Sequence, residues 1–489
     1  MTKNKGKMID LLTSLSKQRG FIFQSSEIYG GLGSTWDYGP LGIELKRNIK
    51  NNWWKSMITT RQNIVGMDAS ILMHSDVWRA SGHIDNFHDP LVDNKENKKR
   101  YRLDHLLEDQ PDEVIDFLSS KLLSGKDFSS IDEKYQAIVT ELTDLGAESE
   151  AVLNDSKMID PETRKPADWT SVRQFNLMFK THLGPLEDTG SVAYLRPETA
   201  QGIFVNYQNV QSSSRQKVPF GIGQIGKAFR NEITTGNFIF RTREFEQMEM
   251  EYFCHPSETK KWLEYWSNER LNWFKSLGIN ELKLRLRAHG DDELAHYSSA
   301  CFDVEYEFDF GWSELEGIAD RGTYDLDKHA EHSGKKLSYF DQPNNEHFTP
   351  AVVETSAGVD RALLTVLADA YHEEEVNGEK RNVLKLSPKI APITVAVFPL
   401  MNKNGMPEIA QKVADDLRNN FSSFYDSGGS IGRRYRRQDE AGTPFGVTVD
   451  HDTLDDNTVT LRERDTMNQI RVNIDQLSEA VVDKIKALE

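Results

Sequence analysis

The sequence has few cysteines, no long apolar run and no excess of positive charge, and each absence excludes a class of protein. Its two cysteines, Cys254 and Cys301, are too few for a disulfide framework or a cage of thiolate metal ligands. No window approaches the ~18 consecutive apolar residues of a membrane-spanning helix. The segment Met1–Gly20 lacks the apolar region of a secretory signal. We therefore expect a cytoplasmic protein with no membrane span.

Positive charge is scarce over the chain as a whole. The 59 basic and 77 acidic residues give a net charge of −18, which argues against a protein that coats nucleic acid. One local exception is the run Gly432–Arg437, which contains Arg433, Arg434, Arg436 and Arg437. From the residues alone, such an isolated run is most simply a solvated helix face.

An intact phosphate-binding loop is also missing. Gly221–Lys227 matches G-x-G-x-x-G, but Ala228 stands where such a loop needs a hydroxyl for Mg²⁺, and both flanks are typical of strands. His329 and His332 have no third metal ligand or H-E-x-x-H frame, so we interpret them as solvated or capping side chains.

The composition changes twice along the chain, which indicates several domains. Residues 93–165 are charged and show two helical patterns, the second with a capping box at Ser130 and Glu133. From Trp169 to Leu386 strands follow one another with few helices, which is typical of an antiparallel sheet. Among the strands we expect are Ile64–Met73, Lys217–Gly223, Lys227–Asn231, Phe238–Phe245 and Met248–Cys254.

A proline-containing hinge, Leu386–Pro392, separates this region from a last segment in which strands and helices alternate. The predicted fold class is therefore α+β. We expect one domain over residues 1–386, with a helical insertion at about 93–165, and a small α/β domain over residues 390–489.

Two arginine-bearing arms and a third arginine describe a possible nucleotide site. Phe229–Glu232 is followed after a short loop by Arg241–Phe245. Arg361 follows Gly358 at the expected start of a helix. Arg230 offers a planar fork suited to phosphate or carboxylate oxygens, and Arg241 and Arg361 add charge for a triphosphate. Together with Phe245, the Arg361 plane could bracket an adenine ring.

A second group of candidate residues is acidic: Glu198, Glu249 and Glu354. Carboxylates near a polyanion site would repel ATP unless they bind a cation, for which an α-ammonium group and Mg²⁺ are the candidates. Glu198 or Glu249 alone would more simply form an ion pair with an arginine on a neighbouring strand.

These residues lie in motifs that resemble class II aminoacyl-tRNA synthetases and, within that class, the dimeric glycyl-tRNA synthetases. The matching stretches extend over nearly the whole chain and are Trp36–Gly42, Leu195–Gly202, Phe229–Glu232, Phe240–Glu249, Glu354–Arg361 and Tyr435–Glu440. The resemblance implies a glycine–tRNA ligase with an antiparallel class II catalytic domain and an anticodon-binding domain. It also implies ATP as substrate, Mg²⁺, a homodimer built in part through Gly39–Pro40, and tRNA(Gly) as partner.

The resemblance also implies roles for individual residues. Arg230 and Arg361 would act in catalysis. Residues expected to bind ATP are Arg230, Asn231, Glu232, Phe240, Arg241, Thr242, Arg243, Glu244, Phe245, Glu314, Leu315, Gly358, Val359, Asp360 and Arg361. Residues expected to bind glycine are Arg102, Glu198, Phe245, Glu246, Gln247, Met248, Glu249, Glu354, Thr355, Ser356, Ala357 and Gly358. Glu314 would bind Mg²⁺, and Arg433, Arg434, Arg436 and Arg437 would lie on or near tRNA.

Three positions depart from the family pattern. Asp93–Lys98 lacks a cysteine pair that some relatives carry, so we expect no zinc, and Ser313 and Thr355 replace the usual Gly and Pro. Two other functions remain open. A synthetase for proline, threonine or serine would share the ATP motifs but not the three glutamates, and a non-catalytic synthetase-like protein should have lost the ATP arginines.

Overall fold

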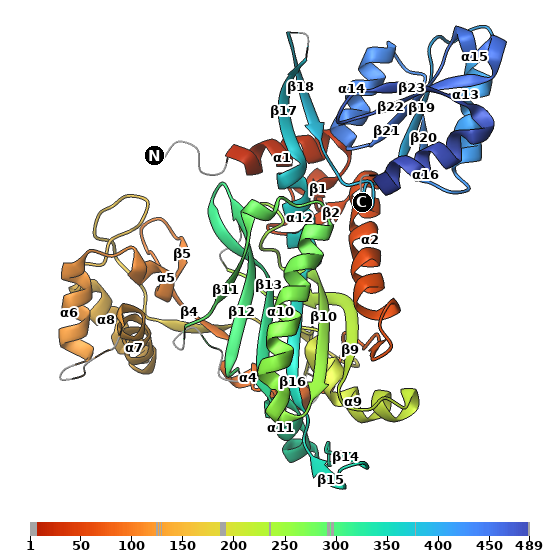
Figure 1. Ribbon diagram of the computed structural model, residues 1–489. Helices are drawn as coiled ribbons and strands as arrows, with labels where there is room; N and C mark the ends of the chain where they lie inside the picture. Colours follow the sequence, from red (N-terminus) through yellow and green to blue (C-terminus); the bar gives the residue numbers. More distant parts are fainter. Residues whose placement is uncertain are drawn as a thin grey trace.

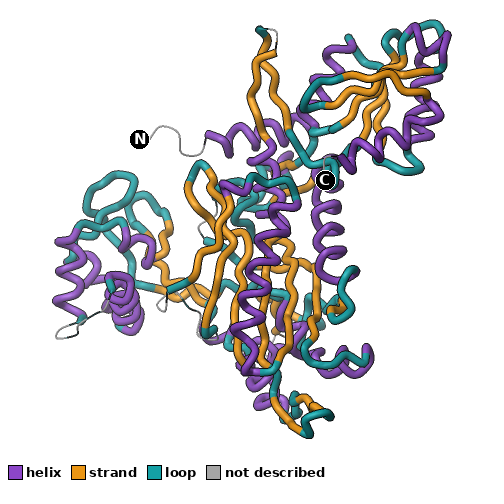
Figure 2. Tube along the Cα trace, viewed as in Figure 1, coloured by secondary structure: helices purple, strands orange, loops and turns teal. Residues whose placement is uncertain are grey.

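The computed structural model describes residues 7–123, 126, 128, 130–185, 192–233, 236–290, 294, 298–376 and 378–487. A central body built on a large sheet carries a mostly helical insertion at one side and a separate α/β domain at the C-terminal end (Figures 1 and 2). Within the described residues, no helix is long and apolar enough to cross a membrane.

The centre of the molecule is a seven-stranded sheet in the order β11-β12-β13-β16-β10-β9-β3. All neighbouring strands pair antiparallel except β3 and β9, which run parallel. This confirms the antiparallel catalytic domain expected from the strand-rich sequence. The bounds of the seven strands are β3 Ile64–Gly66, β9 Phe220–Phe229, β10 Glu244–Cys254, β11 Leu284–Ala288, β12 Ala300–Phe308, β13 Gly311–Gly322 and β16 Ala351–Gly358.

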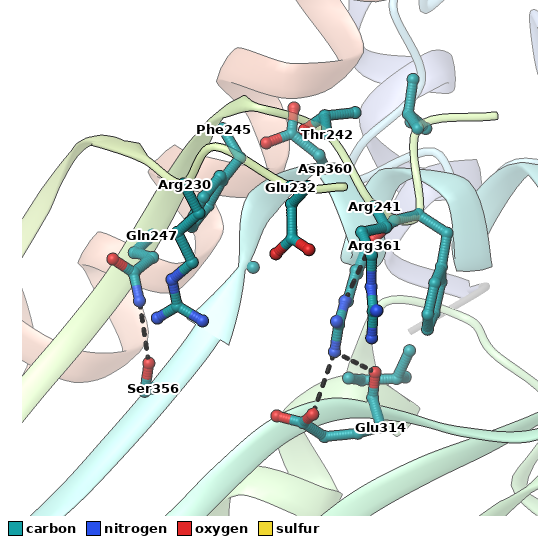
Figure 3. Close-up of a pocket in the computed structure, with 14 residues that line it drawn as sticks. Arg230, Glu232, Arg241, Thr242, Phe245, Gln247, Glu314, Ser356, Asp360 and Arg361 are labelled. Atoms are coloured by element: carbon teal, nitrogen blue, oxygen red, sulfur yellow. Dashed lines mark hydrogen bonds and ion pairs between the residues drawn. The ribbon is translucent and has the colours of Figure 1, made fainter. Parts of the chain in front are cut away.

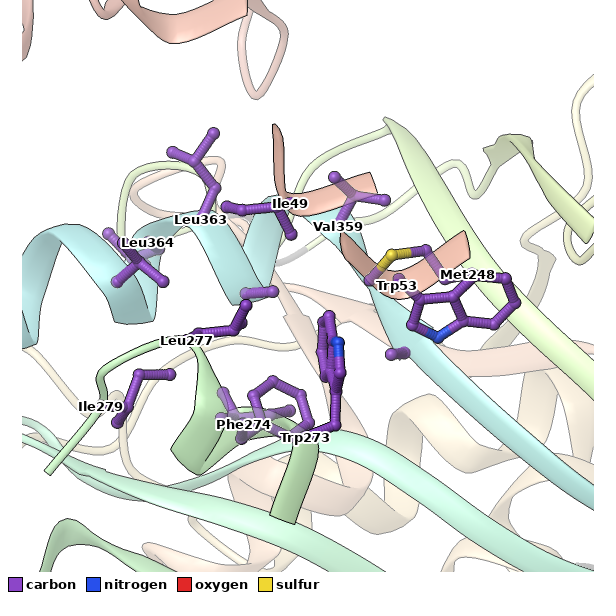
Figure 4. Packing of buried hydrophobic residues seen from close by; sticks show 14 of the residues in the cluster. Ile49, Trp53, Met248, Trp273, Phe274, Leu277, Ile279, Val359, Leu363 and Leu364 are labelled. Atoms are coloured by element: carbon purple, nitrogen blue, oxygen red, sulfur yellow. The ribbon is translucent and has the colours of Figure 1, made fainter. Parts of the chain in front are cut away.

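Helices α10 (Thr259–Ser276) and α12 (Val359–Ala370) pack against this sheet, and α2 (Pro40–Trp54) packs against α12. Leu45, Ile49 and Trp53 recur every four residues on α2 and are fully buried, as their helical spacing predicts. They join one hydrophobic core with side chains from α10, α12 and the sheet (Figure 4). The opposite face of the central strands carries the polar groups described below and a second hydrophobic cluster that includes Phe220, Phe253 and Val352.

The glycine-rich segment Gly221–Lys227 lies inside strand β9, so it is no phosphate loop. Its glycines allow close packing. A Cβ atom at Gly226 would lie 2.2 Å from Nη2 of Arg196, and one at Gly221 would lie 2.7 Å from Sδ of Met250. The two predicted strands on either side of Gly226 are thus one strand, while only Ile64–Gly66 of the predicted strand Ile64–Met73 is extended in the sheet.

The insertion has its own core and a three-stranded sheet in the order β5-β4-β6. Its helix α7 (Ile131–Asp144) begins as the sequence predicts, because Ser130 Oγ accepts a hydrogen bond from the N–H of Glu133 at 3.1 Å. Its other elements are β4 His88–Asp93, β5 Arg100–Arg102, α5 Leu103–Glu108, α6 Asp112–Leu122, α8 Ser149–Asp155 and β6 Arg173–Asn176.

The C-terminal α/β domain is a five-stranded sheet in the order β20-β19-β21-β22-β23, covered by helices. Its bounds are β19 Val395–Pro399, α13 Met406–Leu417, β20 Ser423–Tyr425, α14 Ile431–Ala441, β21 Phe445–Val449, α15 His451–Asp456, β22 Thr458–Glu463, β23 Gln469–Asn473 and α16 Leu477–Ala487. The antiparallel hairpin of β17 (Tyr371–Val376) and β18 (Glu379–Leu384) connects α12 to this domain.

The remaining elements border the sheet or the two other bodies. They are α1 Lys7–Arg19, β1 Ile22–Gln24, β2 Trp36–Tyr38, α3 Ser75–Ala80, α4 His83–Asn86, β7 Lys180–His182, β8 Val192–Tyr194, α9 Ala200–Ser214, α11 Tyr324–Ser333, β14 Tyr339–Asp341 and β15 Glu346–Phe348.

Candidate active site

Two cavities meet on the polar face of the central sheet. The first, called here the arginine cavity, has a volume of about 150 Å³ and is lined by Arg230, Glu232, Ile239, Phe240, Arg241, Thr242, Phe245, Gln247, Glu314, Leu315, Ser356, Gly358, Asp360 and Arg361. The second, the carboxylate cavity, has about 230 Å³ and is lined by Glu198, Arg230, Gln247, Glu249, His289, Ser298, Cys301, Asp303, Glu314, Gly317, Ala319, Glu354 and Ser356. They share Arg230, Gln247, Glu314 and Ser356.

In the arginine cavity, Arg361 and Arg241 lie side by side (Figure 3). Arg361 comes from the first turn of α12. Its Nη1 donates to the backbone oxygen of Glu314 at 2.9 Å and pairs with Oε2 of the same residue at 3.1 Å. Its guanidinium also lies 4.4 Å from the ring centre of Phe240. The cavity therefore offers two cationic planes and aromatic surface, which suits a purine nucleotide phosphate.

Arg230 lies at the junction of the two cavities. Its Nε donates to the backbone oxygen of Pro197 at 3.1 Å, and its guanidinium lies 5.5 Å from the ring centres of Phe87 and Phe245. These contacts hold the stem, and the guanidinium lies near Gln247 and Ser356, which line both cavities (Figure 3). A phosphate in one cavity and a carboxylate in the other could both reach this one group.

The carboxylate cavity is organised around Glu249. Its Oε1 accepts from Ser356 Oγ at 2.6 Å and from Gln247 Nε2 at 2.8 Å, and its Oε2 accepts from the N–H of Thr199 at 2.9 Å. Glu249 and Ser356 are opposite one another on β10 and β16. Glu249 therefore holds in place Gln247 and Ser356, which line both cavities.

A buried network that the sequence analysis did not identify supports the other two glutamates. Arg321 Nη1 donates to both oxygens of Glu354, while its Nε and Nη2 bind Asp325 at 2.7 and 3.0 Å. Gln201 Nε2 donates to Glu198 at 2.9 Å and to Asp325 at 3.0 Å. Two signals could have indicated it: Arg321 and Asp325 stand four residues apart, and Gln201 lies within the motif Leu195–Gly202.

His329 belongs to the same network, so its interpretation as a solvated or capping residue is wrong. The side chain is buried, and Nε2 lies 2.8 Å from Oε1 of Gln201. Because the Gln201 amide nitrogen already donates twice, Nε2 of His329 carries the proton of this hydrogen bond. Burial lowers the pKa of His329, which favours the neutral ring.

The pKa values of the three glutamates are shifted in different directions. Burial raises the pKa of Glu354 to about 7, with Arg321 opposing the shift and Glu249 and Glu198 adding to it. Burial and the charge of Glu198 also raise the pKa of Glu249. For Glu198, burial is outweighed by His83, Arg321 and Gln201, which hold its pKa well below the ordinary value. Glu198 is therefore charged at neutral pH, and Glu354 is poised to ionise when a cation binds.

Two places on these walls could hold a metal ion. Glu314 lies on the shared wall with its side chain 48% exposed; partial desolvation raises the pKa of its carboxyl, but the neighbouring Arg361 outweighs this and lowers the pKa. His289, Cys301 and Asp303 place one ligand atom each within 4.8 Å of one another. Asp303 already contacts His289 Nε2 at 2.8 Å and Arg287 Nη2 at 3.3 Å, so its carboxylate is occupied by neighbouring side chains.

Strand alternation separates the predicted site residues into those that face the cavities and those that do not. Met248, Ala357 and Val359 are fully buried in the hydrophobic core behind the sheet (Figure 4 labels Met248 and Val359). Thr355 is also fully buried. Because side chains alternate along a strand, a motif read as a continuous block names residues on both faces. Contacts between these four side chains and a ligand are therefore not supported by the structure.

Other predicted residues brace the site. Asp360 accepts from Lys46 at 2.8 Å, from the N–H of Glu246 at 2.8 Å and from Tyr38. Glu246 in turn pairs with Lys46 and Lys50 at 2.8 and 2.9 Å. These two carboxylates join the start of α12 and strand β10 to α2. Asp360 also lines the arginine cavity.

Four further predicted residues contact neither cavity. Arg102 pairs within the insertion with Asp104 at 2.5 Å and Asp89 at 3.3 Å. Arg243 donates to the backbone oxygens of Glu232 and Gly33. Glu244 binds Lys227 at the surface, and the N–H of Asn231 donates to Leu177.

The C-terminal arginines differ from one another. Arg434 is buried and its guanidinium donates to the backbone oxygens of Gly429 and Pro399, so the structure does not support direct contact between this side chain and RNA. Arg437 binds Asp426, and Arg436 lies 3.8 Å from Glu379. Arg433 is exposed.

Comparison with family models divides the chain into three matched segments. Residues 89–177 match a model described as glycyl-tRNA synthetase insertion domain 1. Residues 179–370 match the tRNA synthetase class II core domain (G, H, P, S and T), and residues 394–484 match an anticodon binding domain. The second match contains most of the two cavities.

Similarity to individual proteins extends over almost the whole chain. The sequence is 51% identical over 478 residues to a protein named glycine–tRNA ligase from Caldanaerobacter subterraneus subsp. tengcongensis, covering 98% of each chain. It is 50% identical over 482 residues to a protein of the same name from Staphylococcus aureus, covering 98% of this chain and 99% of the relative.

Proposed function

Since this chain belongs to the glycine–tRNA ligase family of class II aminoacyl-tRNA synthetases, we propose that its two adjoining cavities bind ATP and glycine on either side of Arg230. The enzyme activates glycine with ATP and transfers it to tRNA(Gly). One observation carries the assignment of the cavities: Arg230 lines both of them, so a nucleotide phosphate and an amino-acid carboxylate can meet at one guanidinium.

ATP is assigned to the arginine cavity. Its adenine would lie between Phe245 and the plane of Arg361, near Glu232, whose carboxylate can accept from the exocyclic amino group. Arg241 lies beside Arg361 and would bind the terminal phosphates. The carboxylate cavity would repel a triphosphate, which supports this orientation of the nucleotide.

Glycine is assigned to the carboxylate cavity. Its ammonium group would bind Glu198 and Glu354, with the hydroxyl of Ser356 held ready by Glu249. Since these side chains are buried and fixed by Arg321 and Gln201, the wall that faces the ammonium group is held in place, which favours a small amino acid. Glycine has no smaller competitor, so exclusion by size is sufficient for selectivity.

The first step joins the two substrates. An oxygen of the glycine carboxylate attacks the α-phosphorus of ATP, the bond from that phosphorus to the bridging oxygen breaks, and pyrophosphate leaves. Arg230 stabilises the negative charge that gathers on the α-phosphate. Glu314 is the residue we assign to hold Mg²⁺, which would supply charge to offset that of the pyrophosphate.

In the second step a hydroxyl of the terminal adenosine of tRNA attacks the glycyl carbonyl, and AMP leaves. Neither step requires a side-chain nucleophile, because positioning and fixed charge lower both barriers. The C-terminal domain would bind the anticodon arm, with exposed Arg433 as the arginine of α14 most open to RNA.

We also propose that the enzyme is a cytoplasmic homodimer with a catalytic domain over residues 1–386 and an anticodon-binding domain over 390–489. Ile28, Tyr29 and Leu32 support the dimer, because these large apolar side chains are exposed just before the motif Trp36–Gly42. A subunit contact would remove them from water.

A structure with a non-hydrolysable glycyl-adenylate analogue tests the assignment. We expect the adenine between Phe245 and Arg361, the phosphate mimic at Arg230, and the ammonium within hydrogen-bonding distance of Glu198 or Glu354. An ammonium group bound outside the carboxylate cavity would refute it.

A further inference from the structure

Much of the arginine run on α14 is engaged with other groups of the protein. Arg434 and Arg437 bind groups of their own domain, and Arg436 faces Glu379 of strand β18. Helix α14 lies beside the β17–β18 hairpin, which continues directly from α12 (Figure 1). The hairpin therefore connects the helix that carries Arg361 to the domain expected to bind the anticodon.

A fully buried arginine crosses this joint. Arg381 of β18 donates through Nε to Asp439 of α14 at 2.9 Å and through Nη2 to the backbone oxygen of Arg464 at 2.7 Å. Its Nη1 binds Glu374 on the paired strand β17 at 2.8 Å. One guanidinium thus joins the hairpin to a helix and to a strand end of the C-terminal domain. Asp439 also pairs with Arg462 at 3.3 Å, so displacing the hairpin from α14 would break a network of buried ion pairs.

Contacts on both sides of Arg381 fix the same joint. Arg19, at the end of α1, donates to Glu440 of α14 at 2.6 Å, and the two side chains are each 20% exposed. Arg464 Nη2 donates to the backbone oxygen of Leu386 at 2.9 Å. A Cβ atom at Gly442, the residue that ends α14, would lie 2.4 Å from Leu386, so the hinge and the helix end are in close contact.

We propose that Arg381 and Asp439 are positioning residues for the transfer of glycine to tRNA. They hold the anticodon-binding domain at a fixed place relative to the catalytic cavities, so that a tRNA bound by the first presents its terminal adenosine to the second. Amino-acid activation does not use this relationship. Arg381 and Asp439 lie beyond the C-terminal end of α12, whereas Arg361 lies in its first turn. A helix of 12 residues spans roughly 18 Å.

The test compares the two half-reactions in the full-length enzyme. Arg381→Gln and Asp439→Asn are expected to raise the KM for tRNA by about tenfold or more, because small displacements of a bound substrate reduce rates strongly. Glycine-dependent ATP–pyrophosphate exchange should stay within about twofold of the wild type in both variants. Arg418→Ala is the control, since Arg418 caps α13 and pairs with Asp415 of that helix, so its ion pair does not cross the joint.

A charge swap at the partly exposed pair provides a second route if the buried variants do not fold. Arg19→Glu and Glu440→Arg should each raise the KM for tRNA, and the double variant should restore it. An unchanged KM for tRNA in every folded variant would overturn the proposal. So would equal losses in exchange and in charging, which would show that the joint maintains the catalytic domain as a whole.

Discussion

Arg321 binds both carboxylate oxygens of Glu354, at 3.1 and 3.2 Å, at the back of the carboxylate cavity. Both side chains are buried, and Asp325 binds the opposite edge of the same guanidinium. The ion pair stabilises the charged form of Glu354, because burial in the carboxylate cavity would otherwise favour its protonation.

Replacing Arg321 should therefore weaken glycine binding selectively. In Arg321→Met, we expect the KM for glycine to rise by about thirtyfold or more, since a buried charge pair is broken and Glu354 becomes neutral. The KM for ATP should change little. Arg270→Met is the control: Arg270 pairs with Glu316 at 2.6 Å and is equally buried, but neither residue lines a cavity. Equal effects of both variants on the KM for glycine would contradict this role.

Glycine binding should depend on pH through Glu354. Its pKa of about 7 means that the carboxyl is largely protonated below pH 7 and ionised above it. Glycine keeps its ammonium charge over this range, so binding strengthens as the pH rises. We expect kcat/KM for glycine to increase about tenfold from pH 6 to pH 8, as one ionisation requires.

The variant Glu354→Gln identifies the group responsible. It should lower kcat/KM and flatten the pH profile. Glu249 and Glu251 also have pKa values raised by burial, and Glu251 is paired with Glu354 across β10 and β16. A pH profile that keeps its slope in Glu354→Gln would assign the ionisation to one of these neighbours.

Arg361 should affect ATP more than glycine. Its guanidinium contacts Glu314 and Phe240 in the arginine cavity. We expect Arg361→Ala to raise the KM for ATP by about tenfold or more through loss of a charged, planar contact. Lys227→Ala, which breaks only the surface pair with Glu244, should leave both KM values unchanged. A larger rise for glycine than for ATP would place the nucleotide elsewhere.

Gly226 should be sensitive to a single methyl group. A Cβ atom there would lie 2.2 Å from Nη2 of Arg196, whose guanidinium is buried and fixed by the backbone oxygens of Lys227 and Ala69. Gly226→Ala should lower the free energy of unfolding by about 1–3 kcal/mol in urea denaturation. Gly317→Ala is the control, because its Cβ would meet its nearest neighbours at 3.8 and 3.9 Å. Equal unfolding free energies for the two variants would show that Arg196 can move.

The sequence predicted the components of the site better than their orientation. Arg361 stands far along the chain from Arg230 and Arg241, yet the sequence pattern grouped the three arginines and the structure brings them to one cavity. The same motifs named Met248 and Ala357, whose side chains face the core. Period-two alternation along β10 and β16 would have separated these residues from Glu249 and Ser356.

Residues that act through others were harder to identify. Arg321, Asp325 and Gln201 come from three different elements, and only the folded sheet shows that they support Glu198 and Glu354. The arginine run on α14 had the opposite problem. Its charge indicates RNA, but burial of Arg434 and the ion pairs of Arg436 and Arg437 assign much of it to packing.

Amino-acid-dependent ATP–pyrophosphate exchange without tRNA tests the central claim most directly, with glycine, alanine, serine and proline compared in the wild type and in Arg230→Ala. The account predicts exchange with glycine alone and its loss in the variant, because Arg230 serves both cavities and stabilises the charge of the transition state. Exchange with a larger amino acid would contradict the size limit of the carboxylate cavity. Undiminished exchange in Arg230→Ala would contradict the proposal that ATP and glycine react beside Arg230.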